Sequence, residues 1–579
     1  MIRRLSFRLP FCLAALLVSC THAPAAPTAP ASWIERSNQN AQVLLDVGAK
    51  FRPEGASRNG ITGIDDRITD FTPGHRERQR AATRTAMAEL QARGAQEQDP
   101  LVAQDLAILV HAAQEEIEGS ELTEKYQVQY LQPARFIFGS IHALLDPQVA
   151  KDRWPAALAR LQKYVASPSL VELADAETLE GLKNAQLAPP GKLDVENELK
   201  TAKLTEQGID KLFADYKLEG AAAPLAKLHQ QLAERERFVR EEVLPKARAD
   251  FRLPPPLYAF ALKRVGVDIP PEQLTAMAHK SFDEIQGEMQ KVAAQVAQAH
   301  GFQSADYRDV IRELKKDVIP DGQILAHYQG RLNDLEQIIR EHHLVTLPQR
   351  PARIRLGTPA ENAQQPAPHM MPPRLIGNTG EQGEFVLPLS VPGAPDSKYD
   401  DFTFAAASWT LTAHEARPGH ELQFATMLEK GVSIARAQFA FNSVNAEGWG
   451  LYSEAIVLPY MPPEGQLISL QLRLQRAARA FLDPELQQGK WTHESAREFL
   501  MKEVSLSPAF ATSEVDRYTF RSPAQATAYF YGYTRLIELR AAAERKLGPA
   551  FDAQKFHDLI LAQGLLPPDL LSKAVLSAL

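Results

Sequence analysis

The stretch TAHEARPGHELQ, residues 412–423, decides how the rest of this chain is interpreted. A His-Glu pair on a helix begins the zinc-binding pattern in which a second histidine stands four residues after the first. Here the next histidine after His414 is His420, six residues on, and Pro418 occupies the expected position. Residues six apart on an unbroken helix lie about 120° apart around the axis and about 9 Å apart along it, so they cannot share an ion.

Pro418 and Gly419 are expected to interrupt the helix, so the geometry of an unbroken helix does not apply here. Proline ends or kinks a helix, and glycine accepts backbone angles that other residues avoid. A Pro-Gly pair looped out of the helix acts as a two-residue insertion and returns His420 to the position of a second ligand. The pattern then predicts His414 and His420 as metal ligands and Glu415 as the general base. His-Glu alone is more simply explained as two polar residues on a helix surface.

A third ligand is expected on a following helix, because a catalytic zinc ion takes three protein ligands and keeps one position open. The segment FNSVNAEGWGLYSEAIVLPY, residues 441–460, offers Glu447 and Glu454, which lie seven apart and so on one helix face. Glu447 is the first choice for Zn²⁺ and Glu454 the reserve.

A hydrogen-bond donor to the oxyanion of the transition state is expected from ATAYFYGYTRL, residues 526–536. A phenol is protonated at neutral pH and donates one hydrogen bond. Tyr529 and Tyr533 are four apart and share a helix face, so both are candidate catalytic residues, with core packing as the alternative. Three arginines of one helix are interpreted as part of a structural ion-pair network with Asp483, rather than as a carboxylate clamp: Arg473, Arg476 and Arg479.

Most of the chain shows helical spacing of apolar residues, which predicts a mainly α fold. Long helices are expected at 76–96, 99–122, 224–251, 271–300, 304–318 and 322–343. A Pro- and Gly-rich insert at about 345–397 contains RIRLG, PRLIGN and GEFVLPL, which predict a small sheet beside the site whose edge can accept a peptide as an added strand. We expect a helical lobe at 33–250 and a catalytic lobe at 251–579.

The N-terminus, MIRRLSFRLPFCLAALLVSC, has a basic start and an apolar run too short to span a bilayer. LVSC resembles the bacterial lipoprotein signal, which implies a signal peptide at 1–19, a lipidated Cys20 and a Pro/Ala tether at 20–32; ordinary cleavage near Ala26 is the alternative. Thr21 in place of aspartate points to the outer membrane, facing the periplasm. The lipid anchor is then the membrane contact. A net charge of −7 and a pI near 6.1 give no reason to expect nucleic acid.

Three segments, HEARPGHELQ, NAEGWGLYSEA and PAQATAYFYG, together resemble the bacterial domain-of-unknown-function family 885, whose members are often lipoproteins. That family in turn resembles helical zinc peptidases such as carboxypeptidase Taq, angiotensin-converting enzyme and thimet oligopeptidase. The resemblance implies a large helical body with a deep cleft and a site of His414, Glu415, His420 and Glu447, with Tyr529 aligned to a family tyrosine.

The chain departs from the family at three positions: Glu421 and Gln487 replace family histidines, and PAQ at 523–525 replaces Pro-Gly-Gln. Substrate specificity is the property that these departures put in question.

The function expected is an envelope-anchored zinc metallopeptidase acting on peptides. The alternatives are a non-catalytic lipoprotein that binds a peptide or protein partner, and a zinc amidase acting on cell-wall peptides. The sequence leaves the oligomeric state, the choice between endo- and exopeptidase action and the metal loaded in the cell open.

Overall fold

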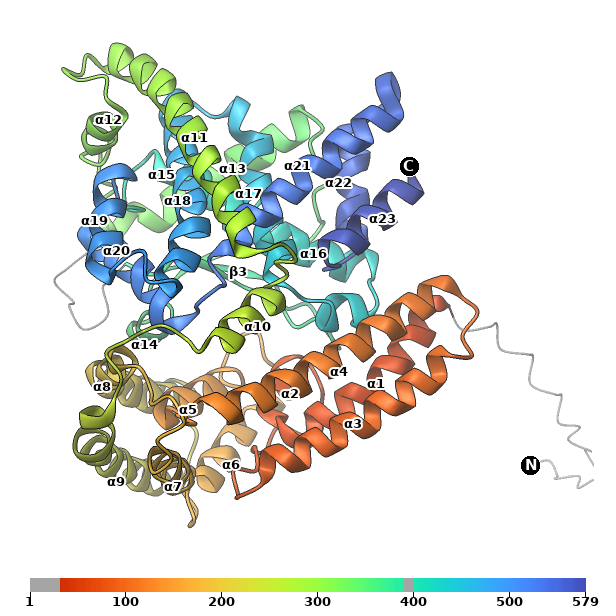
Figure 1. Ribbon diagram of the computed structural model, residues 1–579, viewed down its shortest axis with the longest axis vertical. Helices are drawn as coiled ribbons and strands as arrows, with labels where there is room; N and C mark the ends of the chain where they lie inside the picture. The colour runs from red at the N-terminus through yellow and green to blue at the C-terminus, as the bar shows by residue number, and fades with distance from the viewer. Residues whose placement is uncertain (1–31, 390–399) are drawn as a thin grey trace, which may run out of the picture.

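Helices account for most of the computed structural model, which describes residues 32–389 and 400–579 (Figure 1). This confirms the mainly α fold expected from the sequence. The predicted lipidation site, Cys20, lies outside the described residues. Within the described part of the chain, no helix combines the length and the apolar composition needed to cross a membrane.

The first helix begins where the predicted tether ends, because Ser32 and Glu35 form a reciprocal capping box at its N-terminus. The elements up to residue 246 form the lower group of helices in Figure 1. They are α1 (Trp33–Phe51), α2 (Pro53–Arg58), α3 (His75–Gly94), α4 (Pro100–Tyr126), α5 (Pro133–His142), η1 (Lys151–Arg153), α6 (Pro155–Tyr164), α7 (Leu170–Leu182), α8 (Lys192–Asp215), α9 (Ala222–Phe238), η2 (Val239–Val243) and η3 (Leu244–Lys246).

The helix expected at 224–251 is shorter than predicted. It ends as α9 at Phe238 and continues through one π turn and one 3-10 turn to Lys246. Pro245 stands inside that last turn, where its ring and its missing N–H prevent a continued α-helix.

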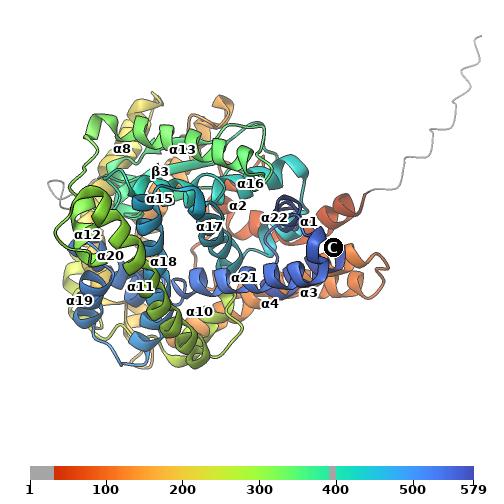
Figure 2. The ribbon, with the colours of Figure 1, turned by 90° about the horizontal axis from the view of Figure 1, so that it is seen from above.

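The second group of helices surrounds the predicted site and lies in the upper part of Figure 1. Figure 2 shows α15, α17, α18 and α21 grouped around the middle of this part. Its elements are α10 (Pro255–Val265), α11 (Pro271–His300), α12 (Tyr307–Leu314), η4 (Asp321–Gln323), α13 (Ile324–Glu341), β1 (Arg353–Leu356), α14 (Pro359–Gln364), β2 (His369–Met371), β3 (Glu384–Leu387), α15 (Ala407–Glu415), α16 (His420–Lys430), η5 (Ala435–Phe439), α17 (Ser443–Val457), η6 (Leu458–Tyr460), α18 (Pro463–Gln487), α19 (His493–Glu503), α20 (Pro508–Asp516), η7 (Arg517–Arg521), α21 (Thr527–Leu547), η8 (Gly548–Ala550), α22 (Ala553–Ala562) and α23 (Pro568–Ala578).

The small sheet has the strand order β1-β3-β2, with β1 parallel and β2 antiparallel to the central β3. Two of its strands are the predicted RIRLG and GEFVLPL segments. The third prediction was wrong: the strand is His369–Met371, not PRLIGN. Pro372 and Pro373 have no N–H to donate to a ladder, and the Asn378 side chain closes the following loop by donating to the Arg374 and Glu381 carbonyls.

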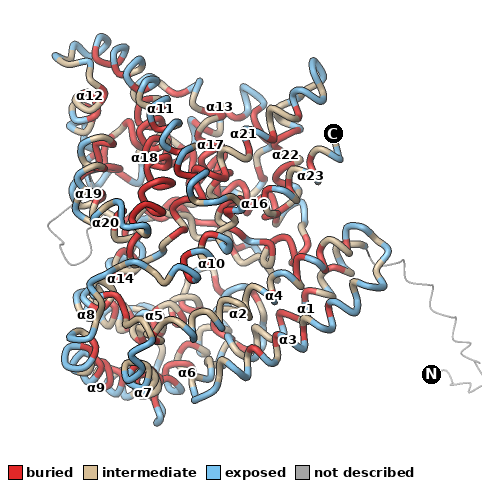
Figure 3. Tube along the Cα trace, in the orientation of Figure 1, coloured by how far each residue is buried: buried red, intermediate tan, exposed pale blue. Residues whose placement is uncertain are grey.

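Helix α18 runs through the largest hydrophobic cluster and is buried along most of its length (Figure 3). The two groups of helices are joined by a buried polar contact as well. Asp105 of α4 accepts hydrogen bonds from Ser433 at 2.5 Å and from Arg436 Nε at 2.8 Å. Because each of these groups is buried and partnered, the contact fixes how the two parts of the chain sit against each other.

Candidate metal centre

The Pro-Gly interruption has the form that the sequence predicted. Helix α15 ends at Glu415 and α16 begins at His420, so 416–419 form a loop between them. The Trp449 indole N–H donates to the Pro418 carbonyl at 3.0 Å and holds the loop in place. Gly419 is required there, because a β-carbon would lie 1.9 Å from the His414 carbonyl oxygen.

His414, His420 and Glu447 converge on one point. Glu447 Oε2 lies 3.5 Å from His414 Nε2 and 3.3 Å from His420 Nε2, and the imidazole centroids are 4.7 Å apart. One ligand atom from each residue lies within 4.8 Å of the other two. Glu447 Oε2 is buried and makes no hydrogen bond to any described residue. Two imidazoles and one carboxylate around an unsatisfied oxygen fit a divalent cation of the zinc type.

Glu454 supports this centre from outside it. Its Oε1 accepts a hydrogen bond from His414 Nδ1 at 2.7 Å, and its Oε2 accepts one from the Thr410 hydroxyl at 2.6 Å. A carboxylate only accepts, so Nδ1 carries the hydrogen and Nε2 faces Glu447. Carboxylates placed in this way behind a histidine ligand fix its tautomer and orientation. Of the two glutamates proposed as third ligand, Glu447 therefore lies at the convergence point and Glu454 behind it.

The carboxylates set the electrostatics of the centre. Burial alone would lower the pKa of His414, but the neighbouring carboxylates of Glu447 and Glu454 outweigh it and raise that pKa to about 9. Burial alone would raise the pKa of Glu447, but the two histidines hold it well below its usual range. The same carboxylates would stabilise a divalent cation in place of the imidazole proton.

Glycines of the segment NAEGWGLYSEA make room for the centre. A β-carbon at Gly450 would lie 2.6 Å from His414 Cε1 and 2.7 Å from its Nε2. One at Gly448 would lie 2.6 Å from the Gly532 backbone, and one at Gly532 would lie 2.0 Å from the Val444 carbonyl. Small residues at a crossing let two helix backbones approach closely, and here they bring α17 against α21 and against the His414 ring.

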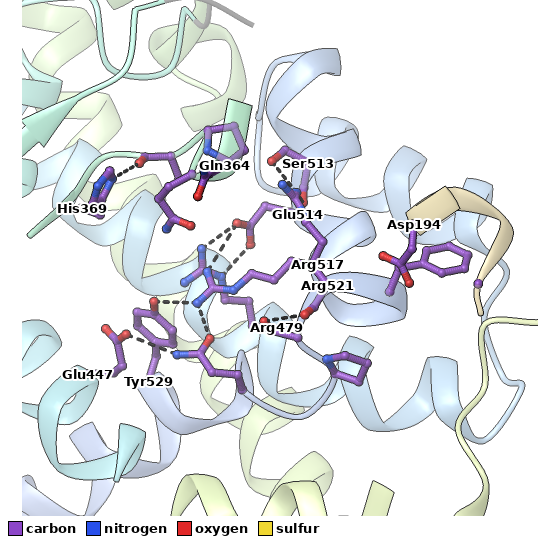
Figure 4. A pocket seen from close by; sticks show the side chains of 18 of the residues that line it. Asp194, Gln364, His369, Glu447, Arg479, Ser513, Glu514, Arg517, Arg521 and Tyr529 are labelled. Atoms are coloured by element: carbon purple, nitrogen blue, oxygen red, sulfur yellow. Dashed lines mark hydrogen bonds and ion pairs between the residues drawn. The ribbon is translucent and has the colours of Figure 1, made fainter. Parts of the chain in front are cut away.

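A cleft of about 910 Å³ opens onto the centre. Its lining includes Glu415, the three converging residues, and side chains from both groups of helices, some of which Figure 4 shows: Asp194, Gln364, His369, Arg479, Glu514, Arg517 and Tyr529. Strand β2 contributes His369 and Met370, so an edge of the sheet borders the same space.

Tyr529 lies beside the centre. Its ring stacks near the His414 ring, with centroids 6.1 Å apart, and its hydroxyl accepts a hydrogen bond from Arg517 Nη2 at 2.8 Å. Burial raises the pKa of this phenol, so it is protonated at neutral pH. Since Arg517 uses a lone pair of the oxygen, the phenol hydrogen is available to a ligand in the cleft.

Tyr533 does not share this position. Four residues carry it about 6 Å further along the helix axis, where its ring packs against the second hydrophobic cluster, 5.2 Å from the guanidinium carbon of Arg473. It is not part of the cleft lining formed by the described residues. Of the two candidate tyrosines, Tyr529 therefore lies beside the centre and lines the described part of the cleft, and Tyr533 does not.

Sequence reasoning missed two contacts of the centre. Gln525 Nε2 donates to Glu447 Oε1 at 3.3 Å, and Gln525 Oε1 accepts a hydrogen bond from Arg517, which also donates to the Tyr529 hydroxyl. The PAQ segment contained the signal for Gln525, because it aligns with a family motif. Arg517 stands in no motif, and its role follows only from the packing of η7 against α18 and α21.

The predicted ion-pair network with Asp483 was wrong. Asp483 accepts hydrogen bonds from the Tyr258 hydroxyl at 2.8 Å and from the Ala524 amide at 2.9 Å. Arg479 forms a bidentate pair with Glu514 instead, at 2.6 and 2.7 Å. Asp483 lies one helical turn beyond Arg479, and the turn at Ala524 gives its carboxylate a partner that no helix periodicity predicts.

Two of the three departures from the family pattern, Glu421 and Gln487, lie away from the centre, whereas the PAQ segment reaches it through Gln525. Glu421 forms a buried ion pair with Arg417 at 2.7 Å. Gln487 accepts from the Leu253 amide at 2.8 Å and donates to the Tyr518 carbonyl. Both make structural contacts, and neither lines the described part of the cleft.

Two solved structures share the fold. A protein of Colwellia psychrerythraea described as a "putative lipoprotein" aligns with 94% of this chain and 99% of its own, at 19% identity and a TM-score of 0.76. A protein of Shewanella oneidensis with the same description, of unknown function, aligns with 94% of this chain and 100% of its own, at 20% identity and a TM-score of 0.70. A comparison with the curated proteins gives no match. Residues 53–575 match the family model "Bacterial protein of unknown function (DUF885)", and the chain belongs to that family.

Proposed function

We propose that this chain is an envelope-anchored zinc metallopeptidase that hydrolyses peptide bonds. The observation that supports this most directly is the convergence of His414, His420 and Glu447 at one wall of a cleft that Glu415 also lines. A zinc ion held by these three residues would polarise the scissile carbonyl and lower the pKa of a water molecule. The remaining steps fall to the side chains of the chain itself.

Glu415 is the general base in this proposal. It directly follows His414, at the end of α15, and its carboxylate lines the cleft beside the converging residues. From there it accepts a proton from the attacking water and returns it to the leaving amine. Glu454 keeps the His414 ring oriented throughout.

Tyr529 is the donor to the oxyanion. Its hydroxyl already accepts from Arg517, so its own hydrogen is directed to a further acceptor, and the developing negative oxygen is the acceptor that needs it. The substrate backbone is supported from the other side by β2, an edge strand of the sheet, against which an extended peptide can add as a further strand.

The proposed location is the outer membrane, facing the periplasm, with Cys20 as the lipidated residue. The N-terminal motif and the lipoprotein description of both structural neighbours support this proposal. Cys20→Ser is expected to move the protein from the membrane fraction to soluble envelope material, or to leave it unprocessed. Unchanged fractionation with the outer membrane would contradict the anchor.

The decisive experiment is metal analysis combined with peptide cleavage. The chain purified without residues 1–20 is expected to hold close to one zinc per molecule and to cleave members of a random peptide pool. A chelator should abolish cleavage and added zinc should restore it, while His420→Ala should neither retain zinc nor regain activity. A fully zinc-loaded protein that binds peptides and leaves every one intact would favour the non-catalytic alternative.

A further inference from the structure

Helix α18 presents buried hydrogen-bond donors to the cleft that have no acceptor. Gln475, Arg476 and Arg479 all line it, and the Arg476 and Arg479 side chains are 7% and 5% exposed. Three of their nitrogens make no hydrogen bond to any residue that the structure describes: Gln475 Nε2, Arg476 Nε and Arg479 Nη1. Unpaired buried donors are rare because each loses its hydration without compensation. This part of the cleft lining therefore suits a ligand with acceptor atoms.

Charge narrows the class of ligand. Three guanidiniums meet around the Tyr529 ring, those of Arg476, Arg479 and Arg517, with carbon-to-centroid distances of 5.8, 4.6 and 5.2 Å. Glu514 is the acid among them: it pairs with Arg479 through both oxygens and lies 4.0 Å from Arg517 Nη1. Figure 4 shows Arg479, Arg517 and Glu514 between Tyr529 and Asp194.

The other carboxylate near this group does not balance its charge. Glu454 lies 3.8 Å from Arg476 Nη2, so with Glu514 there are two carboxylates against three guanidiniums. The three guanidiniums of Arg476, Arg479 and Arg517 therefore keep an excess of buried positive charge, which an anionic ligand would neutralise. Planar guanidinium groups match the two oxygens of a carboxylate.

The distance to the metal centre limits where that carboxylate lies in a substrate. The Tyr529 ring is 6.1 Å from the His414 ring and contacts all three guanidiniums, so one aromatic side chain borders both sites. Arg517 also connects them, through Gln525 to Glu447. An extended peptide advances about 3.3–3.6 Å per residue. A carboxylate bound by these guanidiniums is thus within a few residues of a bond held at the centre.

We infer that the arginine wall of Arg476, Arg479 and Arg517 binds a carboxylate of the substrate peptide a few residues from the scissile bond. This inference rests on the proposed peptidase function and adds the substrate class to it. Two groups of a peptide supply this chemistry, the C-terminal carboxylate and an acidic side chain. The first makes the enzyme an exopeptidase that releases short C-terminal fragments, and the second makes it an endopeptidase directed to acidic residues.

Matched hexapeptide pools separate these outcomes. One pair of pools differs only in a free or amidated C-terminus. A second pair, amidated throughout, differs in Glu or Gln at one fixed position. Loss of cleavage on amidation, with one- to three-residue products from the free pool, identifies the C-terminal carboxylate. Faster cleavage of the amidated Glu pool than of the amidated Gln pool identifies the acidic side chain as the bound carboxylate. Equal cleavage of all four pools would overturn the inference and leave the peptidase proposal intact.

Variants test the wall itself. Arg476→Gln is expected to raise KM for the preferred pool about 10- to 100-fold, the cost of one hydrogen bond to a charged group, and to leave KM for the carboxylate-free pool unchanged. Arg473→Gln is the matched control. Arg473 lies on the same helix and also has unpaired nitrogens, but it packs on Tyr533 outside the cleft lining. Arg479→Gln is made together with Glu514→Gln, so that no buried carboxylate loses its partner.

Binding to the Glu415→Gln protein, measured by calorimetry with the same pools, is independent of hydrolysis. Tighter binding of the carboxylate-bearing pools, lost in Arg476→Gln and kept in Arg473→Gln, supports the wall even if the parent cleaves nothing. Equal binding of all pools by the folded protein contradicts it.

Discussion

Gly450→Ala tests whether His414 belongs to a metal centre, without altering any proposed ligand. The added methyl would lie 2.6 Å from His414 Cε1 and 2.7 Å from Nε2, whereas carbon atoms in good contact are about 3.5–4.0 Å apart. The ring must therefore retreat by about 1 Å. It is fixed from behind by the 2.7 Å hydrogen bond to Glu454, so it cannot retreat as a unit without breaking that bond.

A zinc ligand tolerates displacements of only about 0.2 Å. Loss of an outer partner of a ligand already costs about 10–100-fold in metal affinity, and displacement of the ligand should cost at least as much. Overall stability should change little. The gain in helix propensity on replacing glycine by alanine is up to about 1 kcal/mol, and it partly offsets an overpacking cost of about 1–3 kcal/mol.

Zinc affinity is measured by competition with a chromophoric chelator, alongside the Tm of the metal-free protein. Gly287→Ala in α11 is the control, because nothing lies within 4 Å of its added methyl, and it should leave zinc affinity unchanged. If Gly450→Ala binds zinc as tightly as the parent, His414 is not a ligand and the metal centre fails.

Three further predictions concern single functional groups. Glu415→Gln should retain zinc while the rate of peptide cleavage falls about 10²–10⁴-fold, and undiminished cleavage would exclude Glu415 as the base. Tyr529→Phe should lower kcat with little change in KM and in zinc content, so a kcat equal to that of the parent removes the phenol from the mechanism. Burial raises the pKa of Asp483 to about 7, against about 3.9 in an unfolded chain, so its contribution to stability is full below pH 4 and is lost as the pH rises to 7. The parent should lose up to about 4 kcal/mol of unfolding free energy across that range relative to Asp483→Asn. Parallel pH profiles in urea titrations of the two proteins would refute this.

The convergence of His414, His420 and Glu447 was predictable where its signals lie close together in the sequence. The spacing of His414 and His420 excluded a regular helix, and the intervening Pro418-Gly419 supplied the one local device that restores convergence. Glu447 and Glu454 were correctly placed on one helix, but periodicity could not rank them. The ranking follows from the packing of α17 against α15, which places Glu454 at Nδ1 of His414 and Glu447 at Nε2.

The parts that sequence reasoning missed depend on contacts between distant segments. Gln525 and Arg517 reach the centre only because η7 and α21 pack beside α17 and α18. PRLIGN was wrongly predicted as a strand because it is apolar enough for a sheet. The prolines at its start have no N–H to donate to a neighbouring strand. The arginines of α18 were assigned to a structural ion-pair network because helix spacing shows that they share a face. Spacing does not show how many carboxylates from other elements pair with them.

The close approach of α17 and α21 accounts for much of the site at once. Gly448 and Gly532 meet at the crossing, with no space for a side chain on either helix. On α17, Glu447 and Gly450 lie within two residues of Gly448 and both approach His414. On α21, Tyr529 lies about one turn before Gly532 and stacks near the same ring. The proposed ligand Glu447, the space for the His414 imidazole and the proposed oxyanion donor are thus all positioned by one helix crossing. Glycine in the segments NAEGWG and AYFYGY is therefore as much a part of the site as its histidines, because any larger residue at the crossing would separate the donor from the centre.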